Sequence, residues 1–135
     1  IFENIILPLE VSGINAIIAK KIAEEIMEKV GIGPHKDKFP IQLSGGELQR
    51  AAIARALTLE PDIILADEPT GNLDQATAMD IVKLLSDTNK KDTTIIMATH
   101  NEDIIKKPSK RLISLDKKDK KSPTTGSGLK EDEDF

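Results

Sequence analysis

The sequence predicts an α/β fold, with a parallel sheet core and a helical region ahead of it. The segment Ile63–Ala66 is apolar without polar alternation, which is typical of a strand covered on both faces of a parallel sheet. A helical pattern over Gln75–Thr88 precedes a second apolar run, Thr93–Thr99, and strand, helix and strand of this length form a βαβ unit with a right-handed crossover. Helical spacing of apolar residues dominates the chain before Ile63.

Composition excludes several classes of protein. The chain has 135 residues, enough for one ordinary domain. Its net charge of −4 lacks the excess of positive charge that is typical of nucleic-acid-binding proteins. Cysteine is absent, so disulfides and thiol chemistry are excluded, and no apolar run approaches the roughly 20 residues of a membrane-spanning helix. The chain begins at Ile1 without a methionine, and we expect it to be the C-terminal portion of a longer protein.

Two helices are expected in the first part of the chain. The apolar segment Ile1–Glu10 predicts a buried helix that Pro8 ends or kinks. Asn15 is expected to cap a second helix over Ala16–Val30, with its charged residues on a solvated face. The apolar side of this helix is expected to consist of Ile18, Ile22, Ile26 and Val30, with Met27 beside them.

The segment Gly33–Gln42 is expected to be a loop. Its single histidine, His35, lies among Lys and Asp residues, and we expect it to be exposed to solvent and to have no functional role. Phe39 is expected to anchor the loop by packing.

The stretch Leu43–Gln49, Leu-Ser-Gly-Gly-Glu-Leu-Gln, predicts a helix start of a particular kind. Ser44 and Glu47 have the spacing of a capping box, in which each side chain bonds the other residue's amide. Gly45 and Gly46 would leave the first turn without bulk, so that an anion could approach amides that carry partial positive charge. The helix is expected to end at Glu60, before Pro61, with a stripe of Leu48, Ala51/Ala52, Arg55/Ala56 and Leu59. Taken alone, a well-capped core helix would explain this stretch equally well.

Acidic residues and a histidine follow the two predicted strands. Asp67-Glu68-Pro69 ends the first strand, Asn72-Leu73-Asp74 comes soon after, and His100 ends the second strand. In this order, the motifs resemble those of the ATP-binding cassette (ABC) ATPases over about Ile1–Leu115. Leu43–Glu47 looks like their signature motif and Ile63–Asp67 like their Walker B strand.

The resemblance implies a fragment of a P-loop NTPase that binds ATP and Mg²⁺. It assigns Asp67 to Mg²⁺ through water, Glu68 to the catalytic carboxylate and His100 to sensing the γ-phosphate. Without the resemblance, the Asp-Glu-Pro run would be a strand-to-turn boundary and His100 would cap a short helix. The chain contains no Gly-x-x-x-x-Gly-Lys-Ser/Thr phosphate loop. We expect that loop before Ile1, and we expect negligible ATPase activity from these 135 residues alone.

In this family two nucleotide-binding domains meet head to tail. The resemblance therefore implies that Ser44, Gly45, Gly46 and Glu47 bind the ATP of the partner domain, and that the D-loop, Asn72–Asp74, contacts the opposite site. It also implies a transmembrane permease subunit, no nucleic acid, and a peripheral location on the cytoplasmic face of the cell membrane. The segment Asp67-Glu68-Pro69-Thr70-Gly71-Asn72-Leu73-Asp74 resembles most the subgroup of lipoprotein release, macrolide export and cell division.

Two alternative functions remain open at the level of sequence. One is a soluble ABC-type ATPase of the DNA-repair or translation class, although no sustained heptads of a repair-type coiled coil occur. The other is a catalytically inactive interaction fragment.

The chain divides into three predicted regions. Residues 1–43 form an α-helical subdomain and the lead-in to the signature, and residues 44–116 form the signature helix and the C-terminal half of the ATPase core. Residues 117–135 contain a Lys cluster, a Ser/Thr/Gly-rich stretch and an acidic end, which predict a disordered charged tail.

Overall fold

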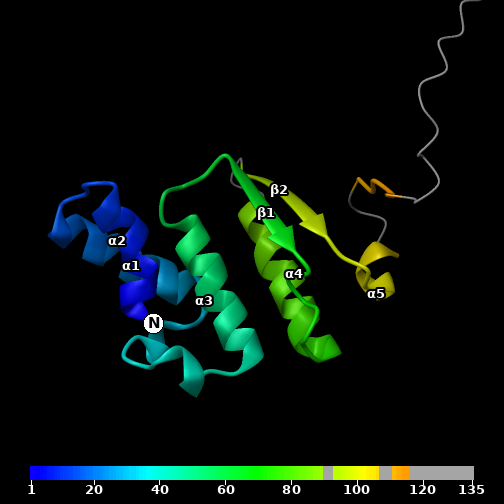
Figure 1. Ribbon diagram of the computed structural model, residues 1–135, viewed down its shortest axis with the longest axis horizontal. Coiled ribbons are helices and arrows are strands. Elements are labelled where there is room, and N and C mark those ends of the chain that lie inside the picture. Colours follow the sequence, from blue (N-terminus) through cyan, green and yellow to red (C-terminus); the bar gives the residue numbers. More distant parts are fainter. Residues whose placement is uncertain (90–92, 107–110, 116–135) are drawn as a thin grey trace, which may run out of the picture.

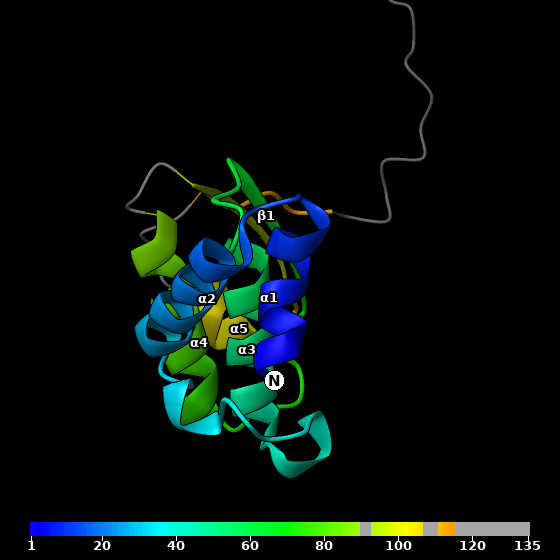
Figure 2. The ribbon, with the colours of Figure 1, turned by 90° about the vertical axis from the view of Figure 1, so that its left-hand side faces the viewer.

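The computed structural model describes residues 1–89, 93–106 and 111–115 (Figure 1). The elements in chain order are α1 (Phe2–Val11), α2 (Ala16–Val30), two 3₁₀ turns (Gly33–His35 and Pro40–Gln42), α3 (Gly45–Leu57), β1 (Ile63–Asp67), α4 (Gln75–Asn89), β2 (Thr94–Ala98) and α5 (Glu102–Ile105). Helix α3 lies in the middle of the molecule, between α1 and α2 on one side and α4 with the strands on the other. Viewed from the helical side, α1 and α2 stand in front of α3 (Figure 2).

The predicted βαβ unit is present. Strands β1 and β2 pair in parallel, in a register that runs from Ile63 opposite Thr94 to Asp67 opposite Ala98. Helix α4 connects the two strands. This register brings the carboxyl ends of both strands to the same edge of the sheet, which is the edge where ligands bind in open α/β folds.

The core lies mainly among the first three helices. Ile5 and Leu9 of α1, Met27 of α2 and the following Ile32 are almost fully buried. The same cluster continues through α3 to a few residues of the sheet and α4. Burial of apolar surface on this scale is the main source of stability for α1, α2 and α3.

Helix α2 has its predicted bounds and its predicted N-cap, Asn15, but its buried side differs in part from the expected one. Ile18 is 55% exposed, and the buried residues are Ala19, Ala23, Met27 and Val30. The expected apolar side is confirmed for Met27 and Val30 and wrong for Ile18. Ala19 and Ala23 let α2 approach its neighbours closely, which leaves the larger Ile22 and Ile26 on the flank of the contact.

Helix α3 also packs through another face than its sequence suggested. Leu48 and Leu59 of the expected stripe are 40% and 49% exposed. The helix ends at Leu57, before the expected end at Glu60. An alanine-rich helix has low contrast between its faces, so the sequence does not determine which face is buried. The buried residues are Gly46, Ala51, Ile53, Ala54 and Leu57.

The strand β1 is covered on one face, whereas the sequence predicted cover on both. Ile64 is 8% exposed, but the alternate residues Ile63 and Leu65 are 57% and 76% exposed. On the neighbouring strand, Ile96 is 56% exposed. Within the described residues, helices therefore cover only one side of the two-stranded sheet.

Smaller differences have local causes. Pro8 neither ends nor breaks α1: it removes one donor, but the amide of Ser12 still donates to the carbonyl of Pro8 at 3.0 Å, so the helix continues to Val11. The sequence Arg-Leu-Ile-Ser-Leu over Arg111–Leu115 also predicts a strand, but these residues have no strand pairing in the structure. The sequence further predicts a short helix over Asn101–Lys107; the structure has α5, and Lys107 lies outside the described residues, as does the charged tail 117–135. Among the described helices, none has the length and apolar character needed to cross a membrane.

Candidate functional site

The predicted capping box is formed at the start of α3. The hydroxyl of Ser44 accepts from the amide of Glu47 at 3.3 Å, and Glu47 Oε2 accepts from the amide of Ser44 at 2.7 Å. The Ser44 hydroxyl also donates to Glu47 Oε2 at 2.9 Å. These hydrogen bonds, led by the backbone amide of Ser44, lower the pKa of the Glu47 carboxyl. The helix start is therefore fixed by the two residues that the sequence identified.

The two glycines of the helix start differ in their surroundings. Ser44 and Gly45 are exposed, whereas Gly46 is buried. A Cβ at Gly46 would lie 2.5 Å from Cγ2 of Thr77 in α4, and a Cβ at Gly45 would lie 3.1 Å from Cδ2 of Leu73. Gly46 thus allows the first turn of α3 to pack against the first turn of α4, and Gly45 and Ser44 are the part of the tip open to solvent.

His35 is not the solvent-exposed residue expected from the sequence. Its Nε2 lies 2.9 Å from Oε1 of Glu47, and its side chain is 20% exposed. The expectation was wrong because the two 3₁₀ turns fold the loop back onto the start of α3. No periodicity or motif in the sequence relates His35 to Glu47, so only the tertiary structure could find this contact.

At the carboxyl edge of the sheet, the predicted acid and histidine lie together. Glu68 Oε1 lies 2.7 Å from Nδ1 of His100 and accepts from the His100 amide at 3.1 Å. Glu68 Oε2 accepts from the hydroxyl of Thr99 at 3.4 Å. The hydrogen bond from the His100 side chain is the main cause that lowers the pKa of Glu68, so this carboxyl stays ionised.

The backbone at Glu68 holds an unusual conformation. Its φ of 43° falls in the left-handed region, which is strained for a residue other than glycine. The amide of Glu68 donates to the carbonyl of Ala98 at 2.9 Å, and its carbonyl accepts from the amide of Gly71 at 3.1 Å. These bonds keep the strained residue in place, one position after the end of β1.

Asp67 is the last residue of β1 and lies on the same edge, with its side chain exposed. Within the described residues, no cluster of three or more His, Asp or Glu side chains could hold a metal ion by itself. The donor set nevertheless suits Mg²⁺, since this ion is usually bound through one or two carboxylates with water and substrate phosphates as its other ligands.

The segment Asn72–Asp74 leads into α4. Asp74 caps that helix: its carboxylate accepts from the amide of Thr77 at 3.0 Å and from the hydroxyl of Thr77 at 2.6 Å. These bonds lower the pKa of Asp74, with the Thr77 hydroxyl as the largest cause. Leu73 packs partly into the core and Asn72 is exposed. Leu73 of this segment therefore lies beside Gly45 at the tip of α3, and Thr77 of α4 lies beside Gly46.

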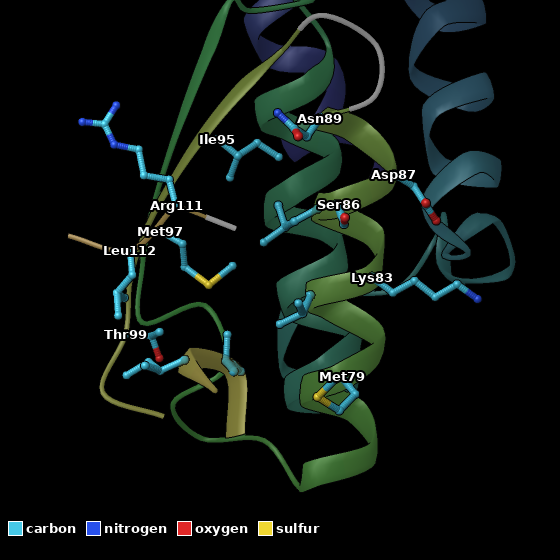
Figure 3. Close-up of a pocket in the computed structure, with 14 residues that line it drawn as sticks. Met79, Lys83, Ser86, Asp87, Asn89, Ile95, Met97, Thr99, Arg111 and Leu112 are labelled. Atoms are coloured by element: carbon cyan, nitrogen blue, oxygen red, sulfur yellow. The ribbon is translucent and has the colours of Figure 1, made fainter. Parts of the chain in front are cut away.

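A separate cavity of about 560 Å³ lies between α4, β2 and the segment that follows (Figure 3). In the close-up, Ile95, Met97 and Leu112 lie on one side and Met79 and Ser86 on the other. Its lining is mainly apolar and includes none of Ser44, Glu47, Asp67, Glu68 or His100. The cavity is thus separate from the α3 tip, and it adjoins the Glu68 cluster through Thr99, which lines it.

Comparison with known families agrees with these features. A family profile described as ABC transporter matches residues 1–71, just over half of the chain. The chain belongs to the ABC transporter family. Within that family, the chain is 43% identical over 116 residues to the cell division ATP-binding protein FtsE of Bacillus subtilis, which covers 86% of the chain and 51% of FtsE.

Two other ABC proteins show the same extent of likeness. An uncharacterized ABC transporter ATP-binding protein of Methanocaldococcus jannaschii, MJ1508, is 45% identical over 108 residues, which is 80% of this chain and 48% of that protein. The dimeric structure of the ATP-binding cassette MJ0796 bound to ADP and Pi aligns with a TM-score of 0.66 and 36% identity, over 76% of this chain and 47% of that one. The chain thus spans about half the length of these relatives, and its fold is that of part of a P-loop ATPase cassette.

Proposed function

We propose that this chain provides two parts of the ATPase subunit of an ABC transporter. One is the signature tip, Ser44–Glu47 at the start of α3, and the other is the set of hydrolytic residues Asp67, Glu68 and His100. The observation that carries the proposal is the contact of Glu68 with His100, held at the carboxyl edge of two parallel strands. Helices α3 and α4 begin at the end of the molecule toward which β1 runs, so the signature tip, the D-loop and this edge share one side (Figure 1).

The residues at the strand edge would divide the chemistry of hydrolysis. Bound ATP with Mg²⁺ supplies the γ-phosphoryl group that is transferred to water. Asp67 would bind the metal ion through water, and Glu68, kept ionised by its contacts, would accept a proton from the attacking water.

His100 would contact the γ-phosphate with its second ring nitrogen. Because Nδ1 faces the carboxylate of Glu68, a neutral ring with its proton on Nδ1 has only an acceptor at Nε2. Donation from Nε2 to a phosphate therefore requires an imidazolium, or a ring that has left Glu68. In either case, the presence of a γ-phosphate at His100 would affect the contact between His100 and Glu68.

The exposed part of the α3 tip would serve a second cassette. Ser44, Gly45 and Glu47 present hydroxyl and backbone groups at a helix N-terminus, while Gly46 provides the close packing behind them. A head-to-tail dimer would bring this tip to the partner's nucleotide. The dimeric structure of the cassette MJ0796 bound to ADP and Pi supports a second cassette as the partner.

We further propose that the partners include a membrane permease subunit, which would place the assembly on the cytoplasmic face of the membrane. The support for this is the likeness to FtsE and to transporter ATP-binding proteins. The relatives named FtsE also favour the cell-division-like part of the subgroup that Asp67–Asp74 resembles.

The test requires a complete cassette. A chimera would join the segment of Bacillus subtilis FtsE that precedes the matched region to Ile1 of this chain. We expect Glu68→Gln in the chimera to reduce ATP turnover by on the order of 10²–10⁴-fold while ATP binding persists, because the amide cannot accept a proton. The same change at an exposed site on α1, Glu3→Gln, is the control and should leave turnover unchanged. Turnover of Glu68→Gln close to that of the unmodified chimera would remove Glu68 from this role.

A further inference from the structure

The loop before α3 places a histidine against the signature cap. His35 Nε2 lies 2.9 Å from Oε1 of Glu47. The other oxygen of the same carboxylate, Oε2, accepts from the amide and the hydroxyl of Ser44 at 2.7 and 2.9 Å. One carboxylate is therefore held from two sides, by His35 at one oxygen and by Ser44 at the other.

The backbone that carries His35 is fixed to the helical core. The amide of His35 donates to the carbonyl of Ile32, a fully buried residue, at 2.9 Å. The next residue, Lys36, accepts from the amide of Phe2 in α1 at 3.1 Å and forms an ion pair with Glu24 in α2. The imidazole is thus presented to Glu47 from a position tied to both α1 and α2.

The second ring nitrogen distinguishes the two neutral tautomers of His35. Nδ1 is buried and has no hydrogen-bond partner among the described residues. A ring with its proton on Nε2 leaves only a lone pair at Nδ1, whereas the other tautomer would bury an N–H group without an acceptor. The arrangement therefore favours the tautomer in which Nε2–H donates to Glu47.

From this geometry, we propose that His35 is a positioning residue for the signature tip: its Nε2–H holds the Glu47 carboxylate where that carboxylate binds Ser44. His35 thereby sets the orientation of the Ser44 hydroxyl. The structural part of this inference is independent of nucleotide chemistry. Its consequence for turnover rests on the proposed function, in which Ser44 is presented to a partner's ATP.

Hydrogen exchange of single amides in the 135-residue chain tests the structural part. In His35→Leu, the Ser44 amide should exchange roughly three- to tenfold faster, the loss expected when one bond of a helix cap is weakened. In His35→Gln, whose amide can donate at a similar reach, exchange should return close to the original rate. The Ile17 amide, which donates to Asn15 Oδ1 at 3.0 Å, is the reference in the same spectra and should not change.

Two results would overturn the proposal. The first is an unchanged Ser44 exchange rate in His35→Leu, and the second is equal acceleration in the Leu and Gln variants. A ¹⁵N spectrum of the ring gives an independent readout that does not depend on a variant that folds: we expect a protonated Nε2 and an unprotonated Nδ1, and the opposite tautomer would contradict the proposal.

The chimera then separates this inference from the proposed function. His35→Leu should lower kcat with little change in the KM for ATP, and His35→Gln should restore kcat. If Glu68→Gln abolishes turnover but His35→Leu does not affect it, the role of His35 in turnover is refuted and the proposed function stands. If the unmodified chimera hydrolyses no ATP, the proposed function fails, while the exchange result still decides the structural part.

Discussion

The helical half of the molecule, α1 to α3, and the strand half, β1 to β2, bury their apolar residues very differently. Leu9 in α1 is fully buried, whereas Leu65 in β1 is 76% exposed. The three helices cover one another, but the sheet has a helical layer on one face only within the described residues. The α3 tip therefore begins a helix with its own core behind it, while Glu68 and His100 lie at the end of a sheet that is covered on one face.

The largest expected effect tests this difference in burial by making the same Leu→Ala substitution in each half. Leu9→Ala should reduce the free energy of unfolding by about 2–5 kcal/mol, because it leaves a cavity in a packed core. Leu65→Ala removes the same atoms from an exposed position and should change it by no more than about 0.5 kcal/mol. Urea denaturation of the two variants measures both values. Equal losses would show that the exposed face of the sheet is covered in solution.

A smaller effect is expected where the two halves meet. Gly46→Ala would place Cβ 2.5 Å from Thr77 Cγ2, so one of the two helices must shift, at a cost of about 1–3 kcal/mol. The matched control is Gly71→Ala, whose Cβ would lie 3.5 Å from the nearest atom, the carbonyl oxygen of Glu68, at ordinary contact distance. Thermal unfolding compares the two. Equal midpoints would mean that α3 and α4 are not packed at Gly46 as described.

The same division explains what could be predicted from sequence. The cap formed by Ser44 and Glu47 depends on residues three apart, so its spacing alone predicted it. The approach of Glu68 and His100 followed from parallel strands that end at one edge. In these cases residue spacing and the rule for parallel strand pairing were sufficient.

Contacts that depend on tertiary packing could not be predicted. The pairing of His35 with Glu47 requires the loop to fold back, and the packing of Gly46 on Thr77 requires the crossing of two helices. The apolar run around Leu65 correctly predicted a strand. An apolar run does not determine whether a layer of helices covers each face of that strand. The three predicted regions of the chain remain a prediction.

The smallest expected effect concerns pH and compares Glu47 of the helical half with Glu68 of the strand half. In both, the folded-state pKa lies below the ordinary value of 4.5. Each ionised carboxylate therefore contributes stability above that value, and the contribution is lost as pH falls through the lower folded-state pKa. The unmodified chain should have a larger free energy of unfolding than Glu47→Gln or Glu68→Gln at neutral pH. This difference should become smaller as the pH falls below about 4.5. A difference that stays constant into acid would contradict these contacts.

The most direct test of the central claim, that the α3 tip and the strand-edge acids act on different nucleotides, is a mixing experiment with two inactive chimeras. One carries Ser44→Arg, which blocks the tip, and the other carries Glu68→Gln. In a head-to-tail dimer of the two, one site combines an intact tip with an intact Glu68, so the mixture should hydrolyse ATP well above the average of its two components. A mixture no more active than that average would show that the tip and the acids serve the same nucleotide, and would contradict the account.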